Sequence, residues 1–184
     1  DMKIVAYKSE NKITNTGDNA WTKEGGLVSV WMLGCFNPNH LCIDNTIHTY
    51  AGIQLRLECN DIMKAQGHSE PIGKAKITSA YNLPSKYIIH TVGPMIFNKV
   101  MKKDCDALES CYRSCLSLAD EYDVNSIAFC CISTGEFKFP NNVAAELAVR
   151  SVKRYKQETG SKIKVIFNVF RENDNQIYKK LLEE

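Results

Sequence analysis

The 184-residue sequence lacks a long apolar run and lacks an excess of charge of either sign. No stretch approaches the roughly 18 consecutive apolar residues of a membrane span, so we expect no membrane partner. The 23 Lys and Arg residues are balanced by 21 Asp and Glu residues, with both signs interspersed along the chain. Because there is no basic stripe and no polybasic patch, we also expect no nucleic-acid partner.

Linkers, internal repeats and low-complexity segments are missing as well, and no secretory leader with a cleavage site follows Asp1. A chain of this length suits one domain, so we predict that residues 1–184 form a single folded unit. Such a chain buries roughly 70% of its unfolded surface on folding and needs no covalent cross-links.

Cysteine, in contrast, is plentiful, with eight residues. Four disulfide bonds are one interpretation, but the size of the chain and the missing secretory signal favour a reducing, cytoplasmic location. Cys130 and Cys131 are adjacent in an apolar run, where cysteine packs as a small hydrophobe. Cys111 and Cys115 stand four residues apart on one expected helix face, where packing is favoured over metal binding.

Apolar periodicity predicts helices that alternate with buried strands. The expected strands are residues 3–7, 27–32, 75–81, 86–92, 126–131 and 164–170. The expected helices are residues 43–66, 104–121, 141–158 and 174–182. This alternation predicts an α/β three-layer fold with a mixed central sheet and helices on both faces.

Two loops of this expected fold could hold a ligand, because ligands of such sheets bind beyond the carboxyl ends of the strands. One loop is residues 32–42. The other runs from Ser133 to Phe139 and leads into a helix, whose N-terminal N–H groups and positive dipole end suit a phosphate. An ordinary strand-to-helix turn is the alternative interpretation of the second loop.

The first loop contains the pattern C-x4-H-x-C, formed by Cys35, His40 and Cys42. Thiolate and imidazole ligands this close together favour zinc, and three protein ligands leave a position open for catalysis. Cys59 is excluded as a fourth ligand if residues 43–66 form one helix, since it would lie about 24 Å along it. A loop with two buried cysteines and a surface histidine is the alternative.

Several stretches, taken in order, resemble one family. Residues 33–52, LGCFNPNHLCIDNTIHTYAG, resemble the zinc loop and following helix of the zinc-containing macrodomains. Residues 73–94, GKAKITSAYNLPSKYIIHTVGP, are similar to a second macrodomain stretch, and residues 131–140, CISTGEFKFP, to the family's phosphate-binding loop. The order and spacing fit from about residue 32 to the C-terminus, so a macrodomain-like fold is implied.

The resemblance implies a set of site residues. The implied zinc ligands are Cys35, His40 and Cys42. Asp44 would be the catalytic residue that positions or activates water near the distal ribose of ADP-ribose. The implied substrate-binding residues are Asn45, the diphosphate loop Ser133, Thr134, Gly135, Glu136 and Phe137, and, near the adenosine, Phe170 and Asn173.

The implied activity is zinc-dependent hydrolysis of mono-ADP-ribose from modified protein side chains, by an ADP-ribosylglycohydrolase-type hydrolase. The partner would be ADP-ribose or a mono-ADP-ribosylated protein. Two usual macrodomain motifs are absent, the early G-D-I-T and the N-A-A-N that precedes the first loop. Their absence favours an alternative, an ADP-ribose reader that has lost turnover and keeps a structural zinc. A zinc domain with an unrelated ligand is the third hypothesis.

Overall fold

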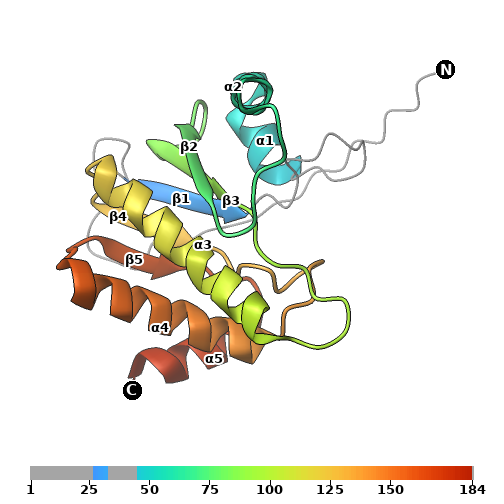
Figure 1. The fold of residues 1–184 in the computed structure, drawn as a ribbon. Coiled ribbons are helices and arrows are strands. Elements are labelled where there is room, and N and C mark those ends of the chain that lie inside the picture. The colour runs from blue at the N-terminus through green and yellow to red at the C-terminus, as the bar shows by residue number, and fades with distance from the viewer. Residues whose placement is uncertain (1–26, 33–44, 184) are drawn as a thin grey trace.

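A computed structural model describes residues 27–32 and 45–183. Its sheet has five strands in the order β2-β3-β1-β4-β5 (Figure 1). The strands are β1 (Leu27–Met32), β2 (Ala75–Ser79), β3 (Tyr87–Thr91), β4 (Ser126–Phe129) and β5 (Lys164–Phe167). Only β2 runs antiparallel to its neighbour, so the sheet is mixed, as the sequence predicts.

Helices cover both faces of this sheet. They are α1 (Asn45–Ala51), α2 (Ile53–Gln66), α3 (Lys102–Glu121), α4 (Asn141–Thr159) and α5 (Glu172–Glu183). Ile88 belongs to a small core with α1 and α2, whereas its neighbour Ile89 belongs to the large core that includes α3 and α4. Because successive strand residues face opposite sides of a sheet, this division demonstrates the three-layer arrangement.

The large core is assembled from residues that the periodicity places on one face of each helix. Leu108, Tyr112 and Cys115 of α3 are buried, and Tyr112 packs on Phe129 of β4 with 4.9 Å between the ring centres. Phe129 in turn stacks on Phe167 of β5 at 6.4 Å. These aromatic contacts fix the two strands whose carboxyl ends carry the loops described below.

The helix expected over residues 43–66 is wrong as a single element. It is divided into α1 and α2 at Gly52, whose φ of 92° lies in the region that favours glycine. A side chain there would also meet Asn82 Nδ2 at 2.7 Å. The straight-helix distance that excluded Cys59 from a metal site therefore does not apply. Cys59 is instead buried between α2 and the sheet.

The strands end earlier than the sequence predicts. Residues 130–131 and 168–170, expected at the ends of two strands, belong to loops because the ladders end at Phe129 and Phe167. The strand expected over residues 3–7 lies outside the described residues. No disulfide bond joins the cysteines of residues 27–32 and 45–183, and burial raises the pKa of the Cys59 and Cys111 thiols to about 11.

Candidate functional site

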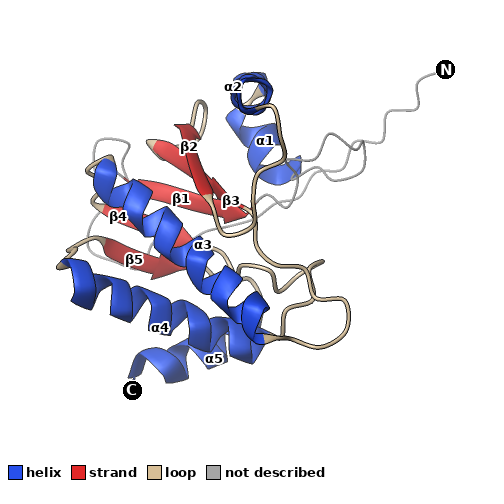
Figure 2. Cartoon of the chain, viewed as in Figure 1, coloured by secondary structure: helices blue, strands red, loops and turns tan. Residues whose placement is uncertain are grey.

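The carboxyl ends of β1, β3, β4 and β5 meet at one edge of the sheet, because these four strands are parallel. Figure 2 shows loops gathered at this edge, between the arrowheads and the helices that follow. In open α/β sheets this is the edge where ligands bind. We call it the carboxyl edge.

The loop that follows β1 carries four of the predicted site residues. Cys35, His40, Cys42 and Asp44 all lie outside the described residues, so the structure does not place them. Asn45 is the first residue of α1, and only its backbone is described. The position of β1 between β3 and β4 nevertheless fixes where this loop starts, at the centre of the carboxyl edge.

The loop between β4 and α4 is held in a compact shape by its own hydrogen bonds. The Thr134 hydroxyl donates to the Cys131 carbonyl at 2.9 Å, the Lys138 N–H to Gly135 O at 3.0 Å, and the Phe139 N–H to Ser133 O at 2.9 Å. Ser133 and Lys138 have φ values of 63° and 56°. Two non-glycine residues in the left-handed conformation are uncommon in so short a loop. They indicate that contacts with the surrounding structure hold the backbone in this shape.

This shape leaves the tip of the loop available to a ligand. Gly135 and Glu136 are exposed and Phe137 is half-buried. Their three N–H groups donate to no acceptor in the described part of the chain. A Cβ on Gly135 would meet nothing within 4 Å, so open space lies next to its backbone. Together with the N-terminus of the 19-residue helix α4, these amides suit an anion.

Two hydrogen bonds tie this loop to other parts of the structure. At its helix end, Asn141 Nδ2 donates to Oδ1 of the buried Asp174 at 2.5 Å, which ties α4 to the first turn of α5. At its tip, the carbonyl of Phe137 accepts the Ile96 N–H at 2.8 Å. Sequence reasoning missed both contacts. The Pro140-Asn141 start of the helix was visible, but its partner lies 33 residues away.

Ionisable groups beneath the loop are held neutral. Burial, together with the nearby Asp174 carboxylate, raises the pKa of the Cys131 thiol to about 12. Burial likewise raises the pKa of Tyr178 and Tyr112 well above the usual range. A raised pKa keeps the Cys131 thiol protonated at neutral pH, which is typical of a cysteine that packs.

The two residues predicted near the adenosine lie after β5, at the far end of the edge. The Phe170 side chain is 89% exposed, and Asn173 is an exposed residue in the first turn of α5. An aromatic ring this exposed offers a stacking surface to a base. The strand order places these residues next to the loop that follows β4 and three positions from β3.

A buried histidine lies on the other side of β1 from the diphosphate loop. The sequence pattern did not identify it as a candidate site residue. His90 of β3 is fully buried and its Nε2 lies 2.8 Å from the Thr78 hydroxyl of β2. Burial and then the proximity of His48 lower the pKa of His90 to about 3. Burial and then Arg56 lower the pKa of His48 as well. Both imidazoles are therefore neutral at pH 7, which suits packing next to the β1 loop.

A groove of about 700 Å³ runs along α3, with Lys74 and Ala75 also in its wall. Several of its polar groups are already engaged: Ser110 and Ser114 both donate to Gly73 O, at 3.0 and 2.7 Å. Glu109, also in the wall, pairs with Arg150 and Arg154. We place the site at the carboxyl edge and not in the groove, because a ligand needs convergent polar groups that the protein has not used itself.

Among the described residues, no three His, Cys, Asp or Glu side chains gather closely enough to hold a metal ion. The predicted ligands Cys35, His40 and Cys42 are not part of that set. Within the same ranges, no helix is both long enough and apolar enough to cross a bilayer.

Sequence comparisons give relatives over most of the chain. The chain is 52% identical over 183 residues to a protein-ADP-ribose hydrolase of Staphylococcus aureus (strain MSSA476), covering 97% of this chain and 68% of the relative. It is 56% identical over 151 residues to a protein-ADP-ribose hydrolase of Treponema medium, covering 82% of this chain and 58% of the relative. Residues 1–44 also match a family of unknown function, DUF6786.

Solved structures agree with the fold. The Oceanobacillus iheyensis macrodomain with ADP superposes with a TM-score of 0.74 at 30% identity, over 89% of this chain and 85% of that one. The Trypanosoma brucei macrodomain in complex with ADP gives 0.68 at 32% identity, over 85% and 62%. The sequence analysis predicted an ADP-ribosylglycohydrolase-type hydrolase. The comparisons instead give hydrolase relatives of the macrodomain type. The zinc-containing subgroup stays a prediction. The model of the Macro domain family matches residues 32–148, and this chain therefore belongs to that family.

Proposed function

We propose that this chain hydrolyses the bond between mono-ADP-ribose and a modified protein side chain. The observation that carries the proposal is the 52% identity, over 97% of the chain, to a relative named a protein-ADP-ribose hydrolase. The similarity to macrodomain structures that contain ADP supports it independently.

The β4–α4 loop supports a specific placement of the substrate. The N–H groups of Gly135, Glu136 and Phe137 would donate to the diphosphate, and the α4 N-terminus would add its positive dipole end. The adenosine would extend toward Phe170 and Asn173 after β5. The distal ribose would then lie over β1, within reach of the loop that carries Asp44.

In this arrangement Asp44 would accept a hydrogen bond from the attacking water and hold it against the distal ribose. The diphosphate loop contributes by holding the substrate in one register, since positioning lowers the barrier without any chemistry by the loop itself. The modified side chain leaves with the proton that water supplies. Asn45, next to Asp44, would contribute to ribose binding.

We further propose that Cys35, His40 and Cys42 hold zinc. The donor set fits zinc by its chemistry, with two thiolates and one imidazole. Cys59 is a poor fourth ligand, because it is buried in the small core with Leu55 and Ile88. Three ligands leave one position open, and zinc, when bound, would supply a Lewis-acidic centre near the distal ribose.

The proposal is tested by release of free ADP-ribose from a mono-ADP-ribosylated protein. Release supports the hydrolase. ADP-ribose binding without release would instead support the reader that the missing G-D-I-T and N-A-A-N motifs favour.

For zinc, we expect Cys35→Ser to lower bound metal from one ion per chain to about one tenth, since losing one of three ligands removes most of the affinity. Metal content is measured by elemental analysis, and turnover should fall at least ~100-fold. Cys105→Ser, in the first turns of α3, is the control and should keep its zinc. Normal turnover by metal-free Cys35→Ser would exclude zinc from the reaction.

A further inference from the structure

The segment between β3 and α3 exposes an unusual amount of apolar surface. Met95, Phe97 and Met101 are 43%, 84% and 51% exposed, within seven residues. Single exposed apolar side chains are ordinary, but clustered ones mark interaction sites. We call these three residues the apolar rim.

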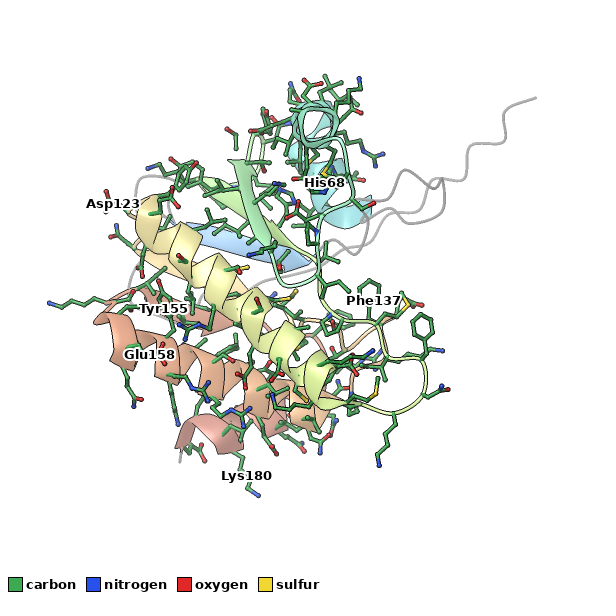
Figure 3. The ribbon with its side chains drawn as sticks, in the orientation of Figure 1. His68, Asp123, Phe137, Tyr155, Glu158 and Lys180 are labelled. Atoms are coloured by element: carbon green, nitrogen blue, oxygen red, sulfur yellow. The ribbon has the colours of Figure 1, made fainter. Side chains whose placement is uncertain are left out.

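The backbone that presents the apolar rim is fixed at several points. Ile96 is buried between Met95 and Phe97, and its N–H donates to the Phe137 carbonyl of the diphosphate loop. At the other end, the Met101 N–H donates to Asp104 Oδ2 at 2.9 Å in the cap of α3. The backbone that carries the exposed side chains is therefore held beside the diphosphate loop. Figure 3 shows Phe137 at this side of the molecule, with Asp123 and Tyr155 at the other.

The strand order says which part of the substrate faces the apolar rim. The proposed ligand lies across the carboxyl edge with adenosine at β5, diphosphate at β4 and distal ribose at β1. The next strand in that direction is β3, and the apolar rim follows it directly. The bond to be cut joins the distal ribose to the protein substrate, so the polypeptide leaves the site toward β3. This step rests on the function proposed above.

We propose that the apolar rim binds the polypeptide of the ADP-ribosylated protein, next to the modified side chain. The charges nearby favour a particular sequence. Lys99, Lys102 and Lys103 are exposed and no acidic residue lies between residues 95 and 103, although Lys102 pairs with Asp106 at 2.6 Å. The preferred substrate therefore has apolar and acidic residues flanking the modified one. The substrate class is a folded or extended protein, and free ADP-ribose makes no contact with the rim.

The experiment compares one enzyme variant on two ligands. The variant is Met95→Ser with Phe97→Ser, and the control is Leu57→Ser, an apolar residue on α2 that is 56% exposed. With a mono-ADP-ribosylated protein as substrate, we expect KM to rise about ten-fold in the rim variant, the usual size of a lost apolar contact. The inhibition constant of free ADP-ribose should stay within about two-fold in all three proteins.

Each other outcome overturns a different statement. Equal weakening of both ligands means that the substitutions distort the site, and no change in either means that the rim binds nothing in this reaction. A wild-type dimer that the rim variant dissolves, seen by sedimentation, assigns the rim to a second copy of the chain. If the wild-type protein releases no ADP-ribose at all, the proposed function itself fails, and the rim proposal fails with it.

Discussion

The diphosphate loop and the groove along α3 both present hydroxyls and charged groups at the surface. They differ in how many of these polar groups already bond within the protein. In the groove, Ser110 and Ser114 satisfy the Gly73 carbonyl, and Glu109 satisfies two arginines. At the loop, Thr134 and Phe139 close the turn, and three amides at the tip remain without an acceptor in the residues described. The groove offers volume, whereas the loop has N–H groups that no acceptor among the described residues uses. A ligand needs such unused hydrogen-bonding groups.

The comparison also extends to backbone conformation. Ser133 and Lys138 hold left-handed conformations in the loop, at a cost of order 1 kcal/mol each. The surroundings must impose this shape, and the Asn141–Asp174 and Ile96–Phe137 hydrogen bonds do so. Beneath the groove, the left-handed residue is Gly73, which carries no such cost. Among the described residues, the other non-glycine residues with positive φ are Tyr81 and Asp123, each alone in its own turn, whereas the loop contains two.

The largest effect is expected at the loop tip. Gly135→Glu should lower kcat/KM for ADP-ribose release about 100- to 1,000-fold, because a carboxylate beside the diphosphate costs several kcal/mol. The melting temperature should stay the same, since a Cβ at Gly135 meets nothing within 4 Å. Gly135→Ala is the control, with a loss of no more than about ten-fold. Full activity of Gly135→Glu would place the diphosphate elsewhere.

A substitution at the groove should do the opposite and damage the fold first. In Gly73→Ala, the φ of 84° is unfavourable for alanine, and the new Cβ would lie 2.9 Å from Ser110 Cβ and Oγ. We expect the free energy of unfolding to fall by about 3 kcal/mol, measured by urea denaturation.

Gly160→Ala is its matched control. Gly160 has a φ of 73° with open space around it, so only the conformational cost of about 1 kcal/mol should appear. In both variants the fraction that remains folded should keep its kcat/KM. A selective loss of turnover in folded Gly73→Ala would mean that the groove takes part in the reaction.

A further test of the region next to β1 concerns pH. Between about pH 6.5 and 3, unfolded His90 takes up a proton that the folded protein refuses, because burial holds its folded pKa at about 3. The free energy of unfolding should therefore fall as the pH drops through this range, by about 1.4 kcal/mol per pH unit from this group alone. His48, whose pKa is also lowered, acts in the same direction.

His90→Gln should flatten that slope, even if the variant is less stable at pH 7. The slope is measured from urea midpoints at pH 7, 6, 5 and 4. The backbone amides of the diphosphate loop do not titrate in this range, so they add no pH dependence of their own. An unchanged slope in His90→Gln would show that another group carries the acid sensitivity.

Short-range patterns in the sequence were enough for most of the fold. Alternating apolar strands and helices predicted the three layers, and Pro140 with Gly160 predicted both ends of α4. The helix break at Gly52 was missed, because a glycine inside a helical period is usually tolerated and the contact with Asn82 that enforces the break comes from 30 residues away. The strand ends were placed too late for a similar reason, since apolar residues continue past the last ladder hydrogen bond.

The candidate site divides in the same way. The residue types of the diphosphate loop and of the C-x4-H-x-C pattern were readable, because they are contiguous in the chain, and the family match agrees with the resemblance they carry. The roles of Cys35, His40, Cys42 and Asp44 stay predictions. The supports of the loop, Asp174 and Ile96, could not be predicted, because neither residue type nor local spacing marks a partner that is distant in sequence.

The sequence by itself determined which elements form and which loops carry chemistry, because helix and strand periods and loop composition are local properties of the chain. Only the tertiary structure decided which loops share an edge. The order β2-β3-β1-β4-β5 sets the carboxyl end of β3 beside that of β1, and the Phe170 segment beside the diphosphate loop. That order depends on pairing between strands separated by up to about a hundred residues, and on which faces the helices can bury. Long-range packing of this kind leaves no local signal. It places Met95, Phe97 and Met101, which follow β3, at the same edge as the proposed site.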